Sequence, residues 1–208
     1  MKISPKKKAI GVALVCTLLG AGVFGYLEIF TKGLDKLPAK VCDGAIDRKT
    51  AASALPDTRK ALERGVLHTT SGGDFMFSCY VKTNSQDSII SGEAETHDAS
   101  VENWSDAAES RPENAIKASA GNVEAITWPD RVTIYVPCTP PGKNKKKALE
   151  SHALIAEART IGDTRATGAP LRQAITDFAY QLIKHAYKAG KCQEAQEFPD
   201  ELSHLPTN

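Results

Sequence analysis

Residues 170–189 read PLRQAITDFAYQLIKHAYKA, and this stretch carries the most regular amphipathic pattern in the C-terminal part of the 208-residue chain. Apolar side chains recur at intervals of three and four residues from Leu171 to Tyr187, which predicts an α-helix with a wide apolar face. Pro170 suits the first turn, and Gly190 suits the end. Such a face has to be covered, so we expect the helix to pack across a β-sheet with Phe178 in the core.

Five segments are predicted to supply that sheet. Residues 74–82 and 88–97 alternate apolar and polar side chains, and we expect them to form an antiparallel hairpin. Residues 123–127 and 131–136 flank a Trp-Pro-Asp turn and read as a second strand pair. Residues 148–160 combine helix-favouring alanine and glutamate with a strand-like alternation, and we interpret this segment as a strand.

Shorter helices are predicted on either side of the hairpin. One begins at Arg48, with Asp47 as its cap, and ends at Pro56. Three further segments carry weaker helical patterns: residues 58–64, 101–108 and 114–118.

The cysteines indicate an oxidising compartment. Cys16 lies in an apolar run, which leaves the even set Cys42, Cys79, Cys138 and Cys192. Their long spacings differ from the paired spacing of structural zinc sites, so two disulfides are expected. Four cysteines allow three connectivities. We favour Cys42–Cys79 and Cys138–Cys192, because each pair then joins a strand end to the flank of a neighbouring helix.

The N-terminal region predicts a membrane segment. Residues 9–27 (AIGVALVCTLLGAGVFGYL) hold no charge, and four lysines lie among the first eight residues. This pattern predicts a transmembrane helix over residues 9–30, with the N-terminus cytoplasmic and the C-terminal domain outside the plasma membrane. A cleaved signal peptide is the alternative, with Gly20 and Gly22 as the small residues at positions −3 and −1 of the cleavage site.

The predicted fold class is therefore α+β. An N-terminal transmembrane helix is followed by an antiparallel sheet of about five strands, packed by the long C-terminal helix and joined by two disulfides. The expected organisation begins with a basic cytoplasmic segment (residues 1–8), a transmembrane helix (residues 9–30) and a linker (residues 31–40). An extracytoplasmic α+β domain (residues 41–192) and a polar tail (residues 193–208) follow.

Charge excludes one class of partner. Residues 34–208 hold 21 basic and 24 acidic residues, a net charge of −3, so we expect no nucleic acid. One loop holds four lysines: Lys143, Lys145, Lys146 and Lys147. This loop could contact anionic lipid headgroups or an acidic envelope polymer. The alternative is an ordinary solvated loop.

The sequence holds none of the serine-hydrolase, zinc-protease, phosphate-loop or dinucleotide motifs. We therefore expect no catalytic residue, no cofactor and no enzymatic activity. The nearest constellation is Glu93, Glu95 and His97, which alternate along one strand face and are candidate ligands for a metal or another group; the alternative is an ordinary solvated sheet face. His185 is interpreted as a histidine at the edge of the core.

Four stretches carry a resemblance: VCDGAIDRKTAASALP, FSCYV, WPDRVTIYVPC and TGAPLRQAITDFAYQLIKHAYKAGKC, at residues 41–56, 77–81, 128–138 and 167–192. In these the chain resembles membrane-anchored or secreted actinobacterial proteins with a four-cysteine extracytoplasmic domain. It is distantly similar to actinobacterial lipoprotein and kinase-sensor domains, although the small residue that should precede a lipid-bearing Cys16 is missing. The resemblance implies an envelope location and carries over no catalytic residue.

Together these features predict a single-pass, membrane-anchored binding or interaction module of the cell envelope. Its expected partners are membrane lipid, through residues 9–30, and an envelope protein or ligand. Two alternatives remain open at this point: an anchored envelope hydrolase with a site around Glu93, and a structural subunit of a membrane assembly.

Overall fold

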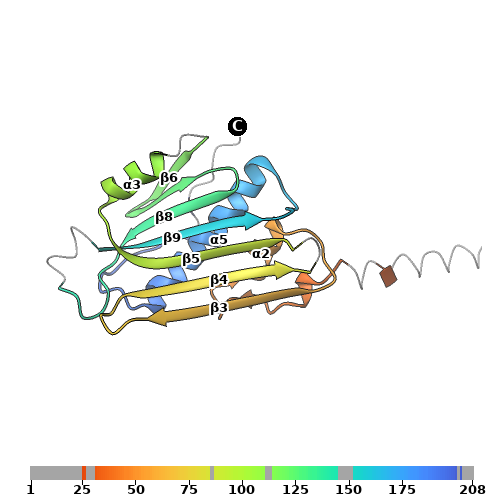
Figure 1. The fold of residues 1–208 in the computed structure, drawn as a ribbon, viewed down its shortest axis with the longest axis horizontal. Helices are drawn as coiled ribbons and strands as arrows, with labels where there is room; N and C mark the ends of the chain where they lie inside the picture. The colour runs from red at the N-terminus through yellow and green to blue at the C-terminus, as the bar shows by residue number, and fades with distance from the viewer. Residues whose placement is uncertain are drawn as a thin grey trace, which may run out of the picture.

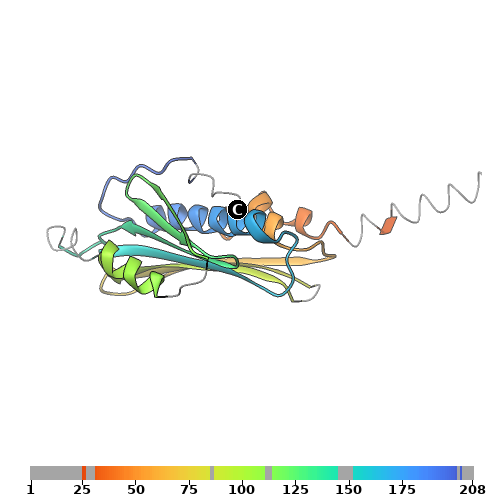
Figure 2. The same cartoon turned by 90° about the horizontal axis from the view of Figure 1, so that it is seen from above.

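The protein is a two-layer α+β structure in which one long helix crosses one face of a seven-stranded antiparallel sheet (Figures 1 and 2). The computed structural model describes residues 25–26, 31–84, 87–110, 114–144, 152–200 and 202. The long helix is α5 (Gly168–Ala189), close to the predicted bounds. The described residues also form the single 3-10 turn η1 (Leu34–Lys36) and the helices α2 (Arg48–Ala54) and α3 (Val101–Glu109).

The large sheet follows the spatial order β3-β4-β5-β9-β8-β7-β6. Its strands, in chain order, are β3 (Ala61–Thr69), β4 (Phe75–Thr83), β5 (Ile89–Asp98), β6 (Ile116–Ala120), β7 (Val123–Thr127), β8 (Arg131–Pro137) and β9 (His152–Ile161). Strands β3–β5 and β6–β8 are two meanders, and the last strand, β9, lies between them and joins them. A small hairpin, β1 (Lys40–Val41) with β2 (Ile46–Asp47), lies outside this sheet.

The hydrophobic core fills the space between the sheet and α5. Alternate residues of β4, β5, β8 and β9 are buried there, because successive side chains of a strand point to opposite faces. The α5 face contributes Phe178, Leu182 and Ile183, each fully buried. This arrangement confirms the predicted packing of the long helix across the sheet.

The predicted fold class is wrong in its strand count. The sheet has seven strands rather than about five, and a separate two-stranded sheet accompanies it. The two missed strands of the large sheet are its edges, β3 and β6, which were predicted as helical segments at residues 58–64 and 114–118. Both are rich in good helix formers such as alanine, leucine, lysine and glutamate, and pairing with a neighbouring strand overrides that local preference.

The fold class is also corrected in its membrane helix. No helix among the described residues is long and apolar enough to span a bilayer. The predicted transmembrane segment, residues 9–30, falls outside the described part of the chain except for Gly25 and Tyr26, which are helical.

Both predicted disulfides are confirmed. Cys42 bonds Cys79, and Cys138 bonds Cys192. Cys138 follows β8 and Cys192 follows α5, so this bond joins a strand end to a helix end, as expected. Cys79 instead lies in the middle of β4, where its partner reaches it from the turn after β1.

Residues that precede the domain core also contact it. The backbone N–H of Gly33 donates to the Thr58 carbonyl at 2.6 Å, and Leu34 is buried. The chain thus enters the fold at the end of the sheet where β3 begins and β4 ends (Figure 1).

Candidate functional site

The sheet face that points away from α5 contains the main candidate site, a groove of about 520 Å³. Figure 2 shows α3 and α5 on opposite sides of the sheet. Because α3 covers only part of the open face, the central strands β4, β5, β9 and β8 remain accessible beside it. The groove is lined by side chains that alternate with the buried core residues of these strands.

Two arginines form one charged row across the groove. Arg159 of β9 lies directly opposite Arg131 of β8, and Ser91 of β5 lies on its other side. Both arginines are exposed. The only ion-pair partner of the Arg131 side chain among the described residues is its neighbour Asp130, whose Oδ1 is 3.2 Å from Nε, and no described residue forms an ion pair with Arg159. We refer to Arg131 and Arg159 as the arginine pair.

Two glutamates form the next row. Glu93 of β5 lies directly opposite Glu157 of β9, with Ser78 and Thr133 at the two ends of the row. Both carboxylates are exposed, and neither forms an ion pair or hydrogen bond with any residue that the structure describes. We refer to Glu93 and Glu157 as the glutamate pair.

The strand register therefore places two pairs of like charges directly opposite each other in one groove: the arginine pair and the glutamate pair. Like charges directly opposite each other in a sheet are destabilising. The two rows are separated by two residues along β9, or about 7 Å at the usual rise of a strand. Despite that proximity, the described structure shows no ion pair between the arginine pair and the glutamate pair. Each pair is thus available to a group from outside.

Aromatic residues flank the charged rows. Tyr80 projects from β4 beside Ser91 and is 39% exposed, and Trp128 lies at the opposite wall, where it is 5% exposed. Trp128 belongs to a small second core beneath α3 that also contains Trp104 and Tyr135. The groove therefore combines four charges with two aromatic rings.

Helix α3 is fixed to the groove by a buried hydrogen bond. The indole Nε1 of Trp104 donates to Oγ1 of Thr133, at 3.0 Å, and the rings of Trp104 and Tyr135 are 5.5 Å apart. Burial raises the pKa of the Tyr135 phenol, which donates to the Ala99 carbonyl at 3.3 Å. Ser100 caps α3 by accepting from the Asn103 backbone. These contacts hold the wall of the groove in place.

The structure separates the three residues that were predicted as a possible ligand cluster. Glu93, Glu95 and His97 do share the open face of β5, as the alternation predicts. Only Glu93 lines the groove, whereas His97 pairs with Glu95 through Nε2 and Oε2 at 3.7 Å. Within the described ranges, no three side chains of histidine, cysteine, aspartate or glutamate are grouped closely enough to hold a metal ion.

Sequence reasoning missed the partners of Glu93. Glu157 and Arg159 alternate with buried residues in the segment 152–161, which is a readable signal for an open strand face. Their position beside Glu93 and Arg131 depends on β9 lying between β5 and β8. This strand order pairs β5 with β9, which lie about 60 residues apart in the chain. The local pattern of apolar and polar residues does not predict which strands become neighbours.

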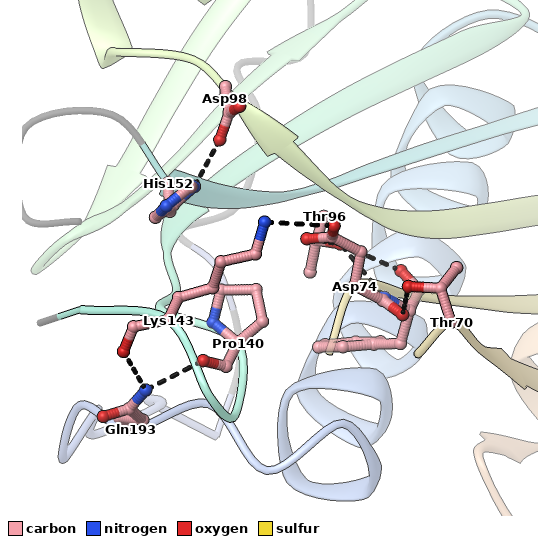
Figure 3. A network of polar contacts seen from close by, with 9 residues as sticks. Thr70, Asp74, Thr96, Asp98, Pro140, Lys143, His152 and Gln193 are labelled. Atoms are coloured by element: carbon pink, nitrogen blue, oxygen red, sulfur yellow. Dashed lines mark hydrogen bonds and ion pairs between the residues drawn. The ribbon is translucent and has the colours of Figure 1, made fainter. Parts of the chain in front are cut away.

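A second polar cluster lies at the far end of the sheet, where it holds a loop in place (Figure 3). Lys143 Nζ is 3.2 Å from Asp74 Oδ2, and Gln193 donates from Nε2 to the carbonyls of Pro140 and Lys143 at 2.8 and 3.1 Å. The Cys138–Cys192 disulfide anchors the same loop. Lys145, Lys146 and Lys147 of the predicted basic loop lie outside the described residues.

The members of this cluster satisfy one another. Thr96 Oγ1 accepts from the Phe75 backbone at 3.1 Å, and His152 pairs with Asp98 (Figure 3). Thr70 donates from Oγ1 to the Asp74 carbonyl at 3.2 Å. Because these groups bond to each other, the cluster holds the strand ends and the loop together. In the groove, by contrast, Glu93, Glu157 and Arg159 have no ion-pair partner among the described residues.

His185 lies at the edge of the core on α5. Its ring is 4.7 Å from that of Phe77, and burial lowers its pKa below the ordinary value of 6.5, with a smaller opposing effect from Asp43. Lys40 and Lys188 add to the lowering.

No family model, curated protein or solved structure matches this chain.

Proposed function

We propose that the protein is an extracytoplasmic, non-catalytic binding module whose ligand site is the groove on the open sheet face. The observation that carries the proposal is the presence of four charged side chains in one groove, three of which have no ion-pair partner among the described residues. An exposed set of convergent polar groups in a concave site is the usual starting point for a ligand site.

The location outside the cytoplasm is supported by the disulfides. All four cysteines of the described domain are bonded, a pattern that persists in oxidising compartments and is rare in the cytosol. The lysine-flanked apolar segment of residues 9–27 is consistent with export of the chain.

A non-catalytic role is favoured over serine-type hydrolysis by the composition of the groove. Its two serines, Ser78 and Ser91, form no hydrogen bond with a histidine or carboxylate in the described structure. A hydrolytic serine needs such a base within hydrogen-bond reach. The groove charges suit electrostatic recognition, which fixes the orientation of a bound molecule.

Thermal unfolding of the purified full chain tests the proposal. Low-molecular-weight fractions of a host envelope extract are added, and the melting temperature is recorded, because a ligand that binds only the folded state raises it. We expect one fraction to stabilise the wild type and not the Arg159→Gln variant. The matched control is Arg64→Gln, which removes an exposed arginine from the same sheet face outside the groove.

Three outcomes contradict the proposal. If the active fraction stabilises wild type and Arg159→Gln equally, the ligand binds elsewhere. If no fraction acts, the groove is not a ligand site for small envelope molecules. If mass spectrometry shows that the wild type consumes a constituent of the active fraction and Arg159→Gln does not, the groove is an enzyme site.

A further inference from the structure

The two charged rows of the groove indicate what kind of molecule it binds, an inference that rests on the function proposed above. We propose that the groove binds a small zwitterion. Its anionic group, a carboxylate or phosphate, meets the arginine pair, and its ammonium group meets the glutamate pair.

The arginine pair is suited to an oxyanion. Guanidinium groups present planar forks of N–H donors that match carboxylate and phosphate oxygens. Arg159 has no competing carboxylate among the described residues, and Arg131 engages Asp130 only through Nε. Opposed side chains of neighbouring strands lie about 5 Å apart, so one oxyanion can accept from both guanidinium groups.

The glutamate pair is suited to an ammonium group. Glu93 and Glu157 are directly opposed, and their carboxylates only accept hydrogen bonds. An ammonium group carries three donors and one positive charge, so it can bridge both carboxylates and remove their mutual repulsion. No described lysine or arginine does this within the protein.

The spacing of the rows sets the length of the ligand. About 7 Å separates them along β9, and the residue between them, Ala158, points toward α5 with its strand neighbour Gly92. The segment of ligand between its two charges therefore lies over backbone. A groove of about 520 Å³ falls in the range of small-molecule sites, and Tyr80 flanks it with an apolar surface.

A singly charged ligand fits the groove less well. An anion held by the arginine pair alone is repelled by the two carboxylates about 7 Å away, and a cation held by the glutamate pair alone is repelled by the arginines. A zwitterion of matching length turns both repulsions into attractions. This is the charge pattern that the register of β5, β9 and β8 creates.

Isothermal titration of the purified full chain with three probes tests the inference. The probes are 6-aminohexanoic acid, hexanoic acid and hexylamine, which share a six-carbon chain and differ in which charges they carry. We expect the zwitterion to bind about tenfold or more tightly than either singly charged probe, since a hydrogen-bonded charged contact contributes about that factor.

Two variants assign the charges. Arg159→Gln is expected to lower the affinity for 6-aminohexanoic acid to that for hexylamine, and Glu157→Gln to lower it to that for hexanoic acid. The matched controls are Arg64→Gln and Glu95→Gln, which lie on the same face outside the groove and are expected to leave the affinity for the zwitterion unchanged.

The outcomes separate this inference from the function on which it rests. Equal affinity for all three probes, or no binding by any of them, overturns the zwitterion. If hexanoic acid alone binds and Arg159→Gln abolishes that binding, the groove is a ligand site for anions, so the proposed function stands and the zwitterion fails. If every affinity is the same in Arg159→Gln, Glu157→Gln and both controls, the groove is not the site and both proposals fail.

Discussion

The aromatic ring of Phe75 lies against the α-carbon of Gly190, where the end of α5 meets the start of β4. A β-carbon on Gly190 would overlap the ring atoms Cζ and Cε2 of Phe75, whose side chain is buried at 3% exposure. We therefore expect Gly190→Ala to lower the free energy of unfolding by about 1–3 kcal/mol, as overpacking of a core does. Denaturant titration followed by far-ultraviolet circular dichroism measures the change.

The matched control is Gly72→Ala in the turn before β4. A β-carbon there would meet its nearest atoms at 3.8 Å, an ordinary contact distance. An equal loss of stability in both variants would contradict the packing explanation, because only Gly190 faces a buried ring.

Loss of either disulfide is expected to destabilise the domain by similar amounts. The chain-entropy account gives about 4 kcal/mol for each, and the sequence separations of 37 and 54 residues differ by only about 0.3 kcal/mol in loop entropy. Paired cysteine-to-alanine variants, Cys42→Ala with Cys79→Ala and Cys138→Ala with Cys192→Ala, provide the comparison by denaturant unfolding. A loss below 1 kcal/mol in either would show that the unfolded chain is already constrained there.

Acidification below pH 6.5 should destabilise the protein through His185. Its folded pKa is lowered by burial, so between that value and 6.5 the unfolded chain binds a proton that the folded chain does not. Stability therefore rises with pH across this window and falls as pH drops through it. Unfolding midpoints of the wild type and His185→Gln are measured from pH 5 to 7.5. The stability advantage of the wild type over the variant is expected to become smaller as the pH falls. A constant difference would mean that the folded pKa is ordinary.

Trp104→Phe should loosen the wall of the groove. The variant removes the donor to Thr133 Oγ1 and leaves a buried hydroxyl without that partner, which is expected to cost about 1–3 kcal/mol. Intrinsic fluorescence during denaturation, carried by the remaining Trp128, reports the change. Thr133→Val in the Trp104→Phe background should recover part of the loss, since it removes the orphaned hydroxyl.

Removing one charge from the glutamate pair should stabilise the free protein. Glu157→Gln relieves the repulsion with Glu93, a gain of about 0.2–1 kcal/mol at low ionic strength that salt reduces. Glu95→Gln is the control, because Glu95 lies opposite the uncharged Ile155 and Met76 and its ion-pair partner, His97, is not a carboxylate, so no repulsion is relieved there. Equal effects of the two variants would show that the opposed carboxylates do not repel.

Strong local periodicity predicted most of the fold. The helix over 170–189 and the hairpin of residues 74–97 were recognised because many residues of each repeat the same pattern. The edge strands were missed for the opposite reason. β3 contains Ala61, Leu62 and Glu63, which favour helix, and only its pairing with β4 makes it a strand.

Less of the candidate site was predictable. The alternation of apolar and polar residues along β5 predicts which side chains lie on its open face, and this pattern identified Glu93 as a candidate ligand residue. The residues that make Glu93 part of a groove come from β8 and β9, and their register with β5 is set by tertiary pairing. A single sequence carries no direct record of which strand lies beside which, so the opposed charges emerge only with the fold.

The disulfide connectivity has a consequence for how the chain matures. Each bond joins cysteines that are consecutive along the described domain, Cys42 with Cys79 and then Cys138 with Cys192. When the domain enters an oxidising compartment in the direction from Cys42 to Cys192, the first thiol pair is complete before Cys138 arrives. Native bonds can then form in the order of emergence, and correct pairing does not depend on an isomerase to reshuffle crossed partners.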